Sequence, residues 1–148
     1  MWHRTTKGAP EAIALADRHY SRAAYGKGGG QVGPPGRLLV LVTDEADALW
    51  VTHWPQPSLA LDGLDSWRCS IFRNESEHRS SDLIVEAMAE TARLWEQEPP
   101  RDGWVTWVDT AHVRSTNPGW CFQCAGWTLD RTWRAATRSR RTLRRLRA

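Results

Sequence analysis

Runs of apolar residues alternate with polar runs along this 148-residue chain, and their lengths predict a mixture of strands and helices. Two apolar runs of strand length occupy residues 37–43 and 48–54, with a polar turn between them. This spacing predicts an antiparallel hairpin. Further strands are expected at residues 67–72, where apolar and polar side chains alternate, and at residues 104–109, which form a buried apolar run.

A long amphipathic helix is predicted between the last two of these strands. Its apolar positions recur with helical spacing at Ile84, Met88, Thr91 and Trp95. A serine or aspartate at residues 80–82 is the expected N-cap, and a pair of prolines stops the helix, so we expect it to run from about residue 81 to residue 97.

The remaining pattern predicts a strand at residues 2–6, a helix beginning at Pro10, a short helix at residues 120–126 and a last strand at residues 127–133. A glycine-rich stretch at residues 25–36 is either a connection or a lid over a site. The resulting order is β, α, β, β, β, α, β, α, β. With 41% hydrophobic residues, the chain is expected to form one mixed α/β domain.

Charge changes this picture at the C-terminal end. The formal net charge is +3, but residues 131–148 hold eight arginines and no acid, which leaves 12 basic against 17 acidic residues before them. We therefore divide the chain into a domain at residues 1–133 and a basic tail at residues 134–148. Such a tail is either solvated or an arm that binds nucleic acid, here through Arg138, Arg140, Arg141, Arg144, Arg145 and Arg147.

The leucines of this tail, Leu143 and Leu146, have a spacing that would let it form a short basic helix on a partner.

Elsewhere, the chain has no apolar run long enough to span a membrane and no signal-peptide core at its N-terminus, so a cytoplasmic location is expected.

The chain has only three cysteines, Cys69, Cys121 and Cys124. A low and odd number argues against a disulfide framework. The spacing of Cys121 and Cys124 also occurs in metal and redox sites, but no second cysteine or histidine pair completes a tetrahedral site. Buried thiols on a short helix are the simpler interpretation.

Candidate chemistry gathers at three places. His19 and Tyr20 stand side by side where the first helix meets the glycine-rich stretch. Asp109 ends a buried strand, where it either faces a cleft or caps the next turn. Arg73 and Arg79 precede the long helix, whose unpaired first-turn amides favour anions; the alternative is that both arginines are only solvated.

Four motifs resemble a known family. They are RHYS at residues 18–21, FRNE at 72–75 together with Ser80 and Ser81, the strand that ends in Asp109, and NPGWCFQCAGW at 117–127. Together with the order of elements over about residues 2–133, they resemble the GCN5-related N-acetyltransferase fold and, more narrowly, the Mom-like bacteriophage DNA-modification proteins. The resemblance implies a mostly antiparallel sheet flanked by helices.

It also implies an acyltransferase, encoded by a phage or prophage, that alters the exocyclic amine of adenine in double-stranded DNA and so protects the DNA from restriction. The donor would be acetyl-CoA or a related acyl-CoA. His19, Tyr20 and Asp109 map to functional positions, with Tyr20 as the acid and His19 or Asp109 as the base. The loop for the cofactor pyrophosphate maps to Arg73, Asn74, Arg79, Ser80 and Ser81.

The sequence departs from this family at two points. The loop at residues 73–81 contains no glycine, and Trp120 and Phe122 stand where ordinary acetyltransferases often carry a tyrosine acid. A flipped adenine would stack on a tryptophan such as Trp54 or Trp107.

Two rival functions fit the same pattern. One is an ordinary acyltransferase that acts on a protein, an aminoacyl-tRNA or a small amine, and the other is a DNA-binding relative without catalysis. A metal held by His19, Asp109 and His112 is a further alternative. A homodimer is left open.

Overall fold

One open sheet organises the fold in the computed structural model, which describes residues 1–21, 30–34, 36–60, 62–113, 116–134 and 143–148. Its strands are β1 (Trp2–Thr5), β2 (Arg37–Thr43), β3 (Ala48–Trp54), β4 (Trp67–Asn74), β5 (Trp104–Asp109), β6 (Thr128–Leu129) and β7 (Leu143–Arg147). The helices are α1 (Pro10–Asp17), α3 (Ser80–Trp95) and α4 (Trp120–Cys124), with a 3-10 turn, η1 (Pro57–Leu59).

The strands follow the order β1-β2-β3-β4-β5-β7-β6 across the sheet. Every neighbouring pair is antiparallel except β4 and β5, which run parallel. The predicted mixed α/β class with a mostly antiparallel sheet is therefore confirmed. The predicted hairpin of β2 and β3 and the strand β5 are confirmed at the expected residues, whereas much of the glycine-rich stretch lies outside the described residues.

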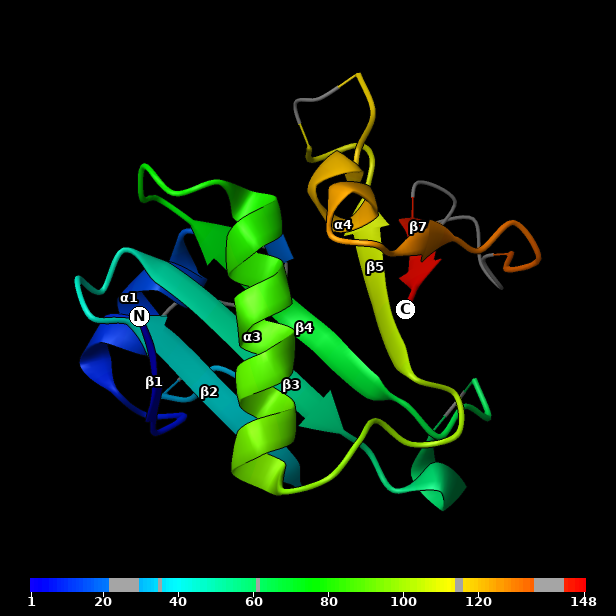
Figure 1. Ribbon diagram of the computed structural model, residues 1–148, viewed down its shortest axis with the longest axis horizontal. Coiled ribbons are helices and arrows are strands. Elements are labelled where there is room, and N and C mark those ends of the chain that lie inside the picture. The colour runs from blue at the N-terminus through cyan, green and yellow to red at the C-terminus, as the bar shows by residue number, and fades with distance from the viewer. Residues whose placement is uncertain (22–29, 35, 61, 114–115, 135–142) are drawn as a thin grey trace.

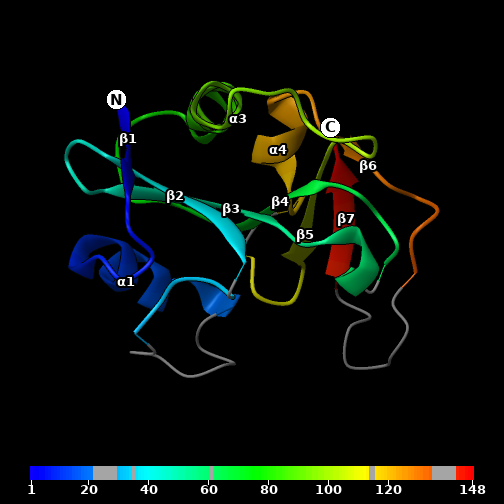
Figure 2. The same cartoon turned by 90° about the horizontal axis from the view of Figure 1, so that it is seen from below.

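Helices cover both faces of the sheet. Figure 2 shows α3 and α4 on one face and α1 on the other. Strand β2 serves both layers, because Leu39 and Leu41 belong to the core beneath α3 whereas Val40 and Val42 belong to the core beside α1. Burial on both faces explains why this strand reads as a continuous apolar run.

Tryptophan fills much of the core under α3 and α4. Five indoles are buried there, namely those of Trp2, Trp50, Trp67, Trp104 and Trp127. The indole N–H of Trp50 donates to Thr52 Oγ1 at 2.7 Å, and that of Trp2 donates to the Leu83 carbonyl at 3.1 Å, whereas that of Trp67 is buried without a partner among the described residues. Burial of an indole costs little when its one polar group is satisfied in this way.

Helix α3 begins differently from the prediction. Its N-cap is Arg79, which has extended backbone angles and makes no side-chain cap bond, so the expected serine or aspartate cap is wrong. The C-terminal end follows the expected pattern more closely, because Glu96 adopts a left-handed conformation shortly before the two prolines. None of the described helices is long and apolar enough to cross a bilayer.

The C-terminal residues correct the predicted tail. Residues 143–147 form β7, which lies between β5 and β6, with Leu146 fully buried and Leu143 opposite Asp109. The proposed short basic helix is therefore wrong for these residues, and residues 135–142 lie outside the described part of the chain. Figure 1 shows β7 in red beside β5. The last predicted strand shrinks to β6, two residues long.

Candidate active site

A cavity opens where β4 and β5 separate. The two parallel strands pair only at Trp67 with Trp104 and at Arg68 with Val105 in the described part of the chain, and the Thr106 hydroxyl donates to the Cys69 carbonyl at 2.9 Å just beyond. From there the strands diverge (Figure 1). The cavity has a volume of about 250 Å³ and is lined by β4, β5 and the segment after α1. Its lining includes His19, Tyr20, Cys69, Trp107, Asp109 and His112.

The Tyr20 side chain lies at the centre of this lining. Its ring stacks on His19 at 4.3 Å between ring centroids and on His112 at 5.7 Å. Its hydroxyl oxygen accepts the backbone N–H of Asp109 at 3.2 Å. Burial raises the pKa of Tyr20, so the phenol stays protonated near neutral pH. The hydroxyl hydrogen therefore remains available for donation to a bound molecule.

Asp109 and His112 form a dyad at the edge of the cavity. The carboxylate accepts the backbone N–H of Ala111 at 3.0 Å, and its second oxygen lies 2.9 Å from His112 Nδ1. An ionised carboxylate has no hydrogen to give, so Nδ1 carries the hydrogen of a neutral His112. Its Nε2 then keeps a lone pair, which makes it the candidate proton acceptor.

His19 has a different protonation pattern. Its Nδ1 accepts the backbone N–H of Ser21 at 3.2 Å and lies 2.8 Å from the Ser21 hydroxyl. Burial, followed by the positive charge of Arg73, lowers the pKa of His19 to about 4. The ring is therefore neutral at pH 7, and because Nδ1 accepts from Ser21, its hydrogen is on Nε2, where it can be donated.

An arginine-glutamate cluster includes Arg18, the residue before this histidine. Arg18 donates twice to Glu75, at 2.7 Å in each case, and Arg73 donates from Nε to Glu75 and from Nη1 to the Arg18 carbonyl at 2.6 Å. The hydrogen bond from Arg18 is the main reason that the pKa of Glu75 falls to about 2. The cluster ties the end of β4 to the segment after α1, next to His19.

Of the predicted pyrophosphate residues, Arg73 and Asn74 are already engaged. The Asn74 amide donates to the His78 carbonyl at 2.8 Å and to Ser80 Oγ at 3.0 Å, and its oxygen accepts from the backbone N–H of Ser76 at 2.9 Å. These bonds hold the loop that leads into α3.

The other three predicted residues are placed differently. Arg79 is exposed, whereas Ser81 is buried, and no side chain caps the helix start at Ser80. None of the five predicted residues lines the cavity, although the charge of Arg73 acts on His19, which does. The first turn of α3 and Arg79 are the parts that remain open to an anion.

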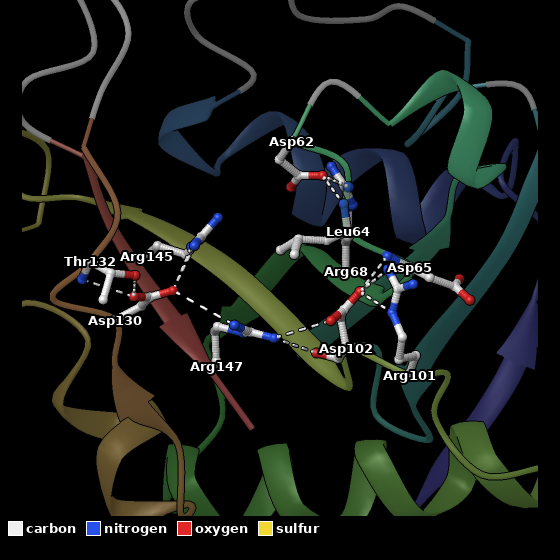
Figure 3. Close-up of polar contacts among 10 residues, drawn as sticks. All are labelled: Asp62, Leu64, Asp65, Arg68, Arg101, Asp102, Asp130, Thr132, Arg145 and Arg147. Carbon is white, nitrogen blue, oxygen red and sulfur yellow. Dashed lines mark hydrogen bonds and ion pairs between the residues drawn. The ribbon is translucent and has the colours of Figure 1, made fainter.

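The predicted nucleic-acid arginines fall into three groups. Arg138, Arg140 and Arg141 lie outside the described residues. Arg145 pairs with Asp130 at 2.6 Å, and Arg147 donates to the Asp102 carbonyl at 3.1 Å and lies 3.8 Å from its carboxylate (Figure 3). These two side chains hold β7 in the sheet. Arg144 is exposed and makes no ion pair with the described acids.

Burial makes two of the three thiols, those of Cys69 and Cys121, poor nucleophiles. Cys69 is fully buried, which raises its pKa well above the usual value, and burial also raises the pKa of Cys121. All three cysteines are free. Within the described ranges no three histidine, cysteine or acidic side chains are grouped as metal ligands, so the geometry does not support a metal on His19, Asp109 and His112.

His19, Tyr20 and Asp109, the candidates from the sequence, line one cavity together with His112, which was expected only as a metal ligand. The i, i+3 spacing of Asp109 and His112 was the available signal for a hydrogen-bonded dyad. Of the two tryptophans expected to stack on a base, Trp107 lines the cavity, whereas Trp54 packs against Trp67 and Trp95 elsewhere.

Comparison of the chain with family profiles, curated proteins and solved structures finds no match.

Proposed function

We propose that this protein is an acyltransferase related to the GCN5-type enzymes and that it modifies the exocyclic amine of adenine in DNA. The observation that carries the proposal is the cavity between diverging β4 and β5, where Tyr20 and the Asp109–His112 dyad meet. Acyl transfer to an amine needs a proton acceptor for the nucleophile and a proton donor for the leaving group. These two groups stand on adjacent stacked rings.

The chain supplies both proton positions. Nε2 of His112 accepts the proton that the attacking amine loses, while Asp109 holds the ring in the productive tautomer and stabilises its charge. The Tyr20 hydroxyl gives its hydrogen to the departing sulfur. One C–N bond forms as one C–S bond breaks, and exchange of protons with water restores His112 and Tyr20. The neutral His19 Nε2–H is available to the developing oxyanion.

A CoA-type donor would supply an acyl group held as a thioester. Arg79 and the first turn of α3, which has no side-chain cap, suit its phosphates, because backbone N–H groups at a helix start favour anions, as does a guanidinium that makes no ion pair with the described acids. The edge of β4 beyond Cys69 suits an extended chain with amide groups, since its strand-facing backbone groups are not paired with β5 there. The loop without glycine keeps its shape through Asn74.

Adenine is the proposed acceptor because the cavity offers an aromatic face. Trp107 is half-buried in the lining, and the Arg68 guanidinium lies 5.4 Å from the centre of its ring. Stacking a base on an indole contributes about 1–3 kcal/mol. A base in duplex DNA would have to leave the stack to reach this face.

The test is to incubate the protein with acetyl-CoA and either plasmid DNA or lysine-rich peptides. The masses of the digested nucleosides and peptides are then measured by mass spectrometry. We expect a heavier deoxyadenosine with wild type and none with Tyr20→Phe, which removes the donated hydrogen but keeps the ring. Acylated peptides beside unchanged nucleosides would assign the protein to the ordinary acyltransferases. Tight DNA binding without any product would favour the non-catalytic relative.

A further inference from the structure

A second cavity, more polar than the first, lies beside β6 and β7. Its volume is about 650 Å³, and its lining carries Arg131, Arg134, Arg144 and Arg145 against a single acid, Asp130. A concentration of guanidinium groups around one hollow favours a ligand with several negative charges. We refer to this hollow as the arginine groove.

The single acid of the arginine groove is already neutralised. Asp130 Oδ2 accepts from Arg145 Nη2 at 2.6 Å and from Nε at 2.9 Å, and its other oxygen accepts from the Thr132 hydroxyl at 2.6 Å (Figure 3). The hydrogen bond from Thr132, and after it those from Arg145, lower the pKa of Asp130 to about 2, so the carboxylate stays charged and paired. The charge of the other three arginines is therefore not cancelled within the groove.

Two of those three arginines are free to bind a ligand. Arg131 and Arg144 are exposed, and neither pairs with an acid among the described residues. The Arg134 guanidinium turns back to donate to the carbonyls of Arg131 and Trp133, at 2.6 and 2.9 Å. A planar guanidinium without a carboxylate partner matches the geometry of a phosphate group.

The arginine groove adjoins the candidate active site. Leu143 lines both cavities, and β7 places this leucine opposite Asp109 of the catalytic dyad. Arg144, the next residue, faces the groove. A strand of nucleic acid that lay in the groove would therefore reach the cavity of Tyr20 and His112 within a short distance along its backbone.

An aromatic side chain adds to the charge. Trp133 lines the arginine groove beside the guanidinium groups and is half-buried, so part of its indole is exposed there. Arginines interleaved with an aromatic ring are the combination that binds single-stranded nucleic acid, with phosphates on the charges and a base on the ring. A free phosphate ion would gain nothing from the indole.

We propose that the arginine groove binds the sugar-phosphate backbone of the DNA strand next to the base that enters the active site. The inference rests on the proposed function and names its missing part, the surface that holds the substrate. It also reassigns the binding role: Arg131 and Arg144 contact phosphate, whereas Arg145 and Arg147 hold the fold.

The test measures how DNA binding depends on salt concentration. The readout is the fluorescence anisotropy of labelled single-stranded and duplex DNA. The double variant Arg131→Ala/Arg144→Ala is compared with wild type and with Arg4→Ala, an exposed arginine on β1 at the opposite edge of the sheet. Each lost phosphate contact lowers the slope of log K against log salt by about 0.7 for single strands and about 0.9 for duplex. We expect a decrease of about 1.4 for single strands in the double variant and none in Arg4→Ala.

An equal slope in wild type and the double variant would overturn the inference, as would an absence of DNA binding by wild type. A parallel titration with CoA separates the two phosphate sources, since loss of CoA affinity with an unchanged DNA slope would assign the groove to the donor. Thermal melting confirms that the double variant folds. If the slope falls but no nucleoside is ever modified, the groove stands and the proposed enzyme activity fails.

Discussion

The hydrogen bond between Asp109 and His112 decides which nitrogen of the imidazole is free. In Asp109→Asn the amide oxygen can still accept the Ala111 N–H, but the amide nitrogen would then donate to His112 Nδ1. The ring hydrogen would move to Nε2, and the proposed base would lose its lone pair. We therefore expect the turnover number to fall by about 10²–10⁴-fold, because general base catalysis contributes that much.

The measurement is the initial rate of nucleoside modification at saturating DNA. His112→Asn, which removes the base itself, should lose a similar factor, and the double variant should be no worse than either single one because the two residues act as a unit. Equal rates in Asp109→Asn and wild type would remove the dyad from the mechanism.

A second effect at the residue scale is the pH dependence of stability that His19 introduces. Its pKa is about 4 in the folded protein, against an ordinary value of 6.5, so between these values the unfolded chain binds a proton that the folded chain does not. Stability is therefore complete above about pH 6.5 and declines as the pH falls toward 4. Glu75, with a pKa lowered from 4.5 to about 2, acts mainly in a more acidic window.

Urea unfolding at about pH 7 and about pH 5 measures this loss. His19→Asn keeps an acceptor for the Ser21 N–H and cannot titrate, so its free energy of unfolding should change less between the two pH values than that of wild type. His78→Asn, at an exposed histidine, is the matched control and should keep the wild-type difference. The same difference in His19→Asn as in wild type would contradict this account.

At the scale of elements, β7 is held by charge as much as by packing. The ion pair of Arg145 and Asp130 is almost completely buried, with 10% and 8% of the side chains exposed. Arg145→Ala removes the nearest cation from the buried Asp130 carboxylate, which keeps the Thr132 hydroxyl and has Arg147 at 4.0 Å, so the cost should be about 3 kcal/mol, the lower end for a broken buried pair. Arg144→Ala, one position away on the exposed side of the strand, should stay within about 0.5 kcal/mol of wild type.

Chemical unfolding of the two variants compares them directly. Removal of residues 143–148 should be worse than either, because it withdraws the buried Leu146 and leaves the edge of β5 unpaired. Truncation therefore cannot test a binding role for the C-terminal arginines. Similar stability of Arg145→Ala and Arg144→Ala would show that the ion pair does not hold the strand.

The elements were predictable where local pattern decides them. The runs of β2, β3 and β5 and the amphipathic face of α3 are properties of short segments, and each was found from the sequence. Strand β7 was not, because its leucines have helical spacing and its arginines resemble a solvated tail. Its conformation depends on Asp130 and Asp102, which lie 15 and 45 residues away from their arginine partners.

At the scale of the whole molecule, the candidate site depends on contacts that the sequence only partly indicates. Tyr20 and Asp109 are 89 residues apart and meet because the segment after α1 reaches the end of β5. Both residues were candidates by type and by position at an element end. The dyad with His112 is a local i, i+3 contact whose spacing the sequence contains, whereas the arginine groove follows from tertiary structure, because it joins residues 117–134 to β7.

The tryptophans of the whole molecule differ in where they lie, so single indoles can report on where a donor binds. Trp107 is the indole that lines the active-site cavity, whereas five others lie in the core and Trp120 is 59% exposed on α4. If a CoA-type donor enters this cavity, its titration should give a saturable change in tryptophan fluorescence that Trp107→Phe largely removes. Trp120→Phe is the matched control, because it deletes an indole outside the cavity and should keep the change. A change that survives in Trp107→Phe and vanishes in Trp120→Phe would place the donor at α4, away from Tyr20 and His112.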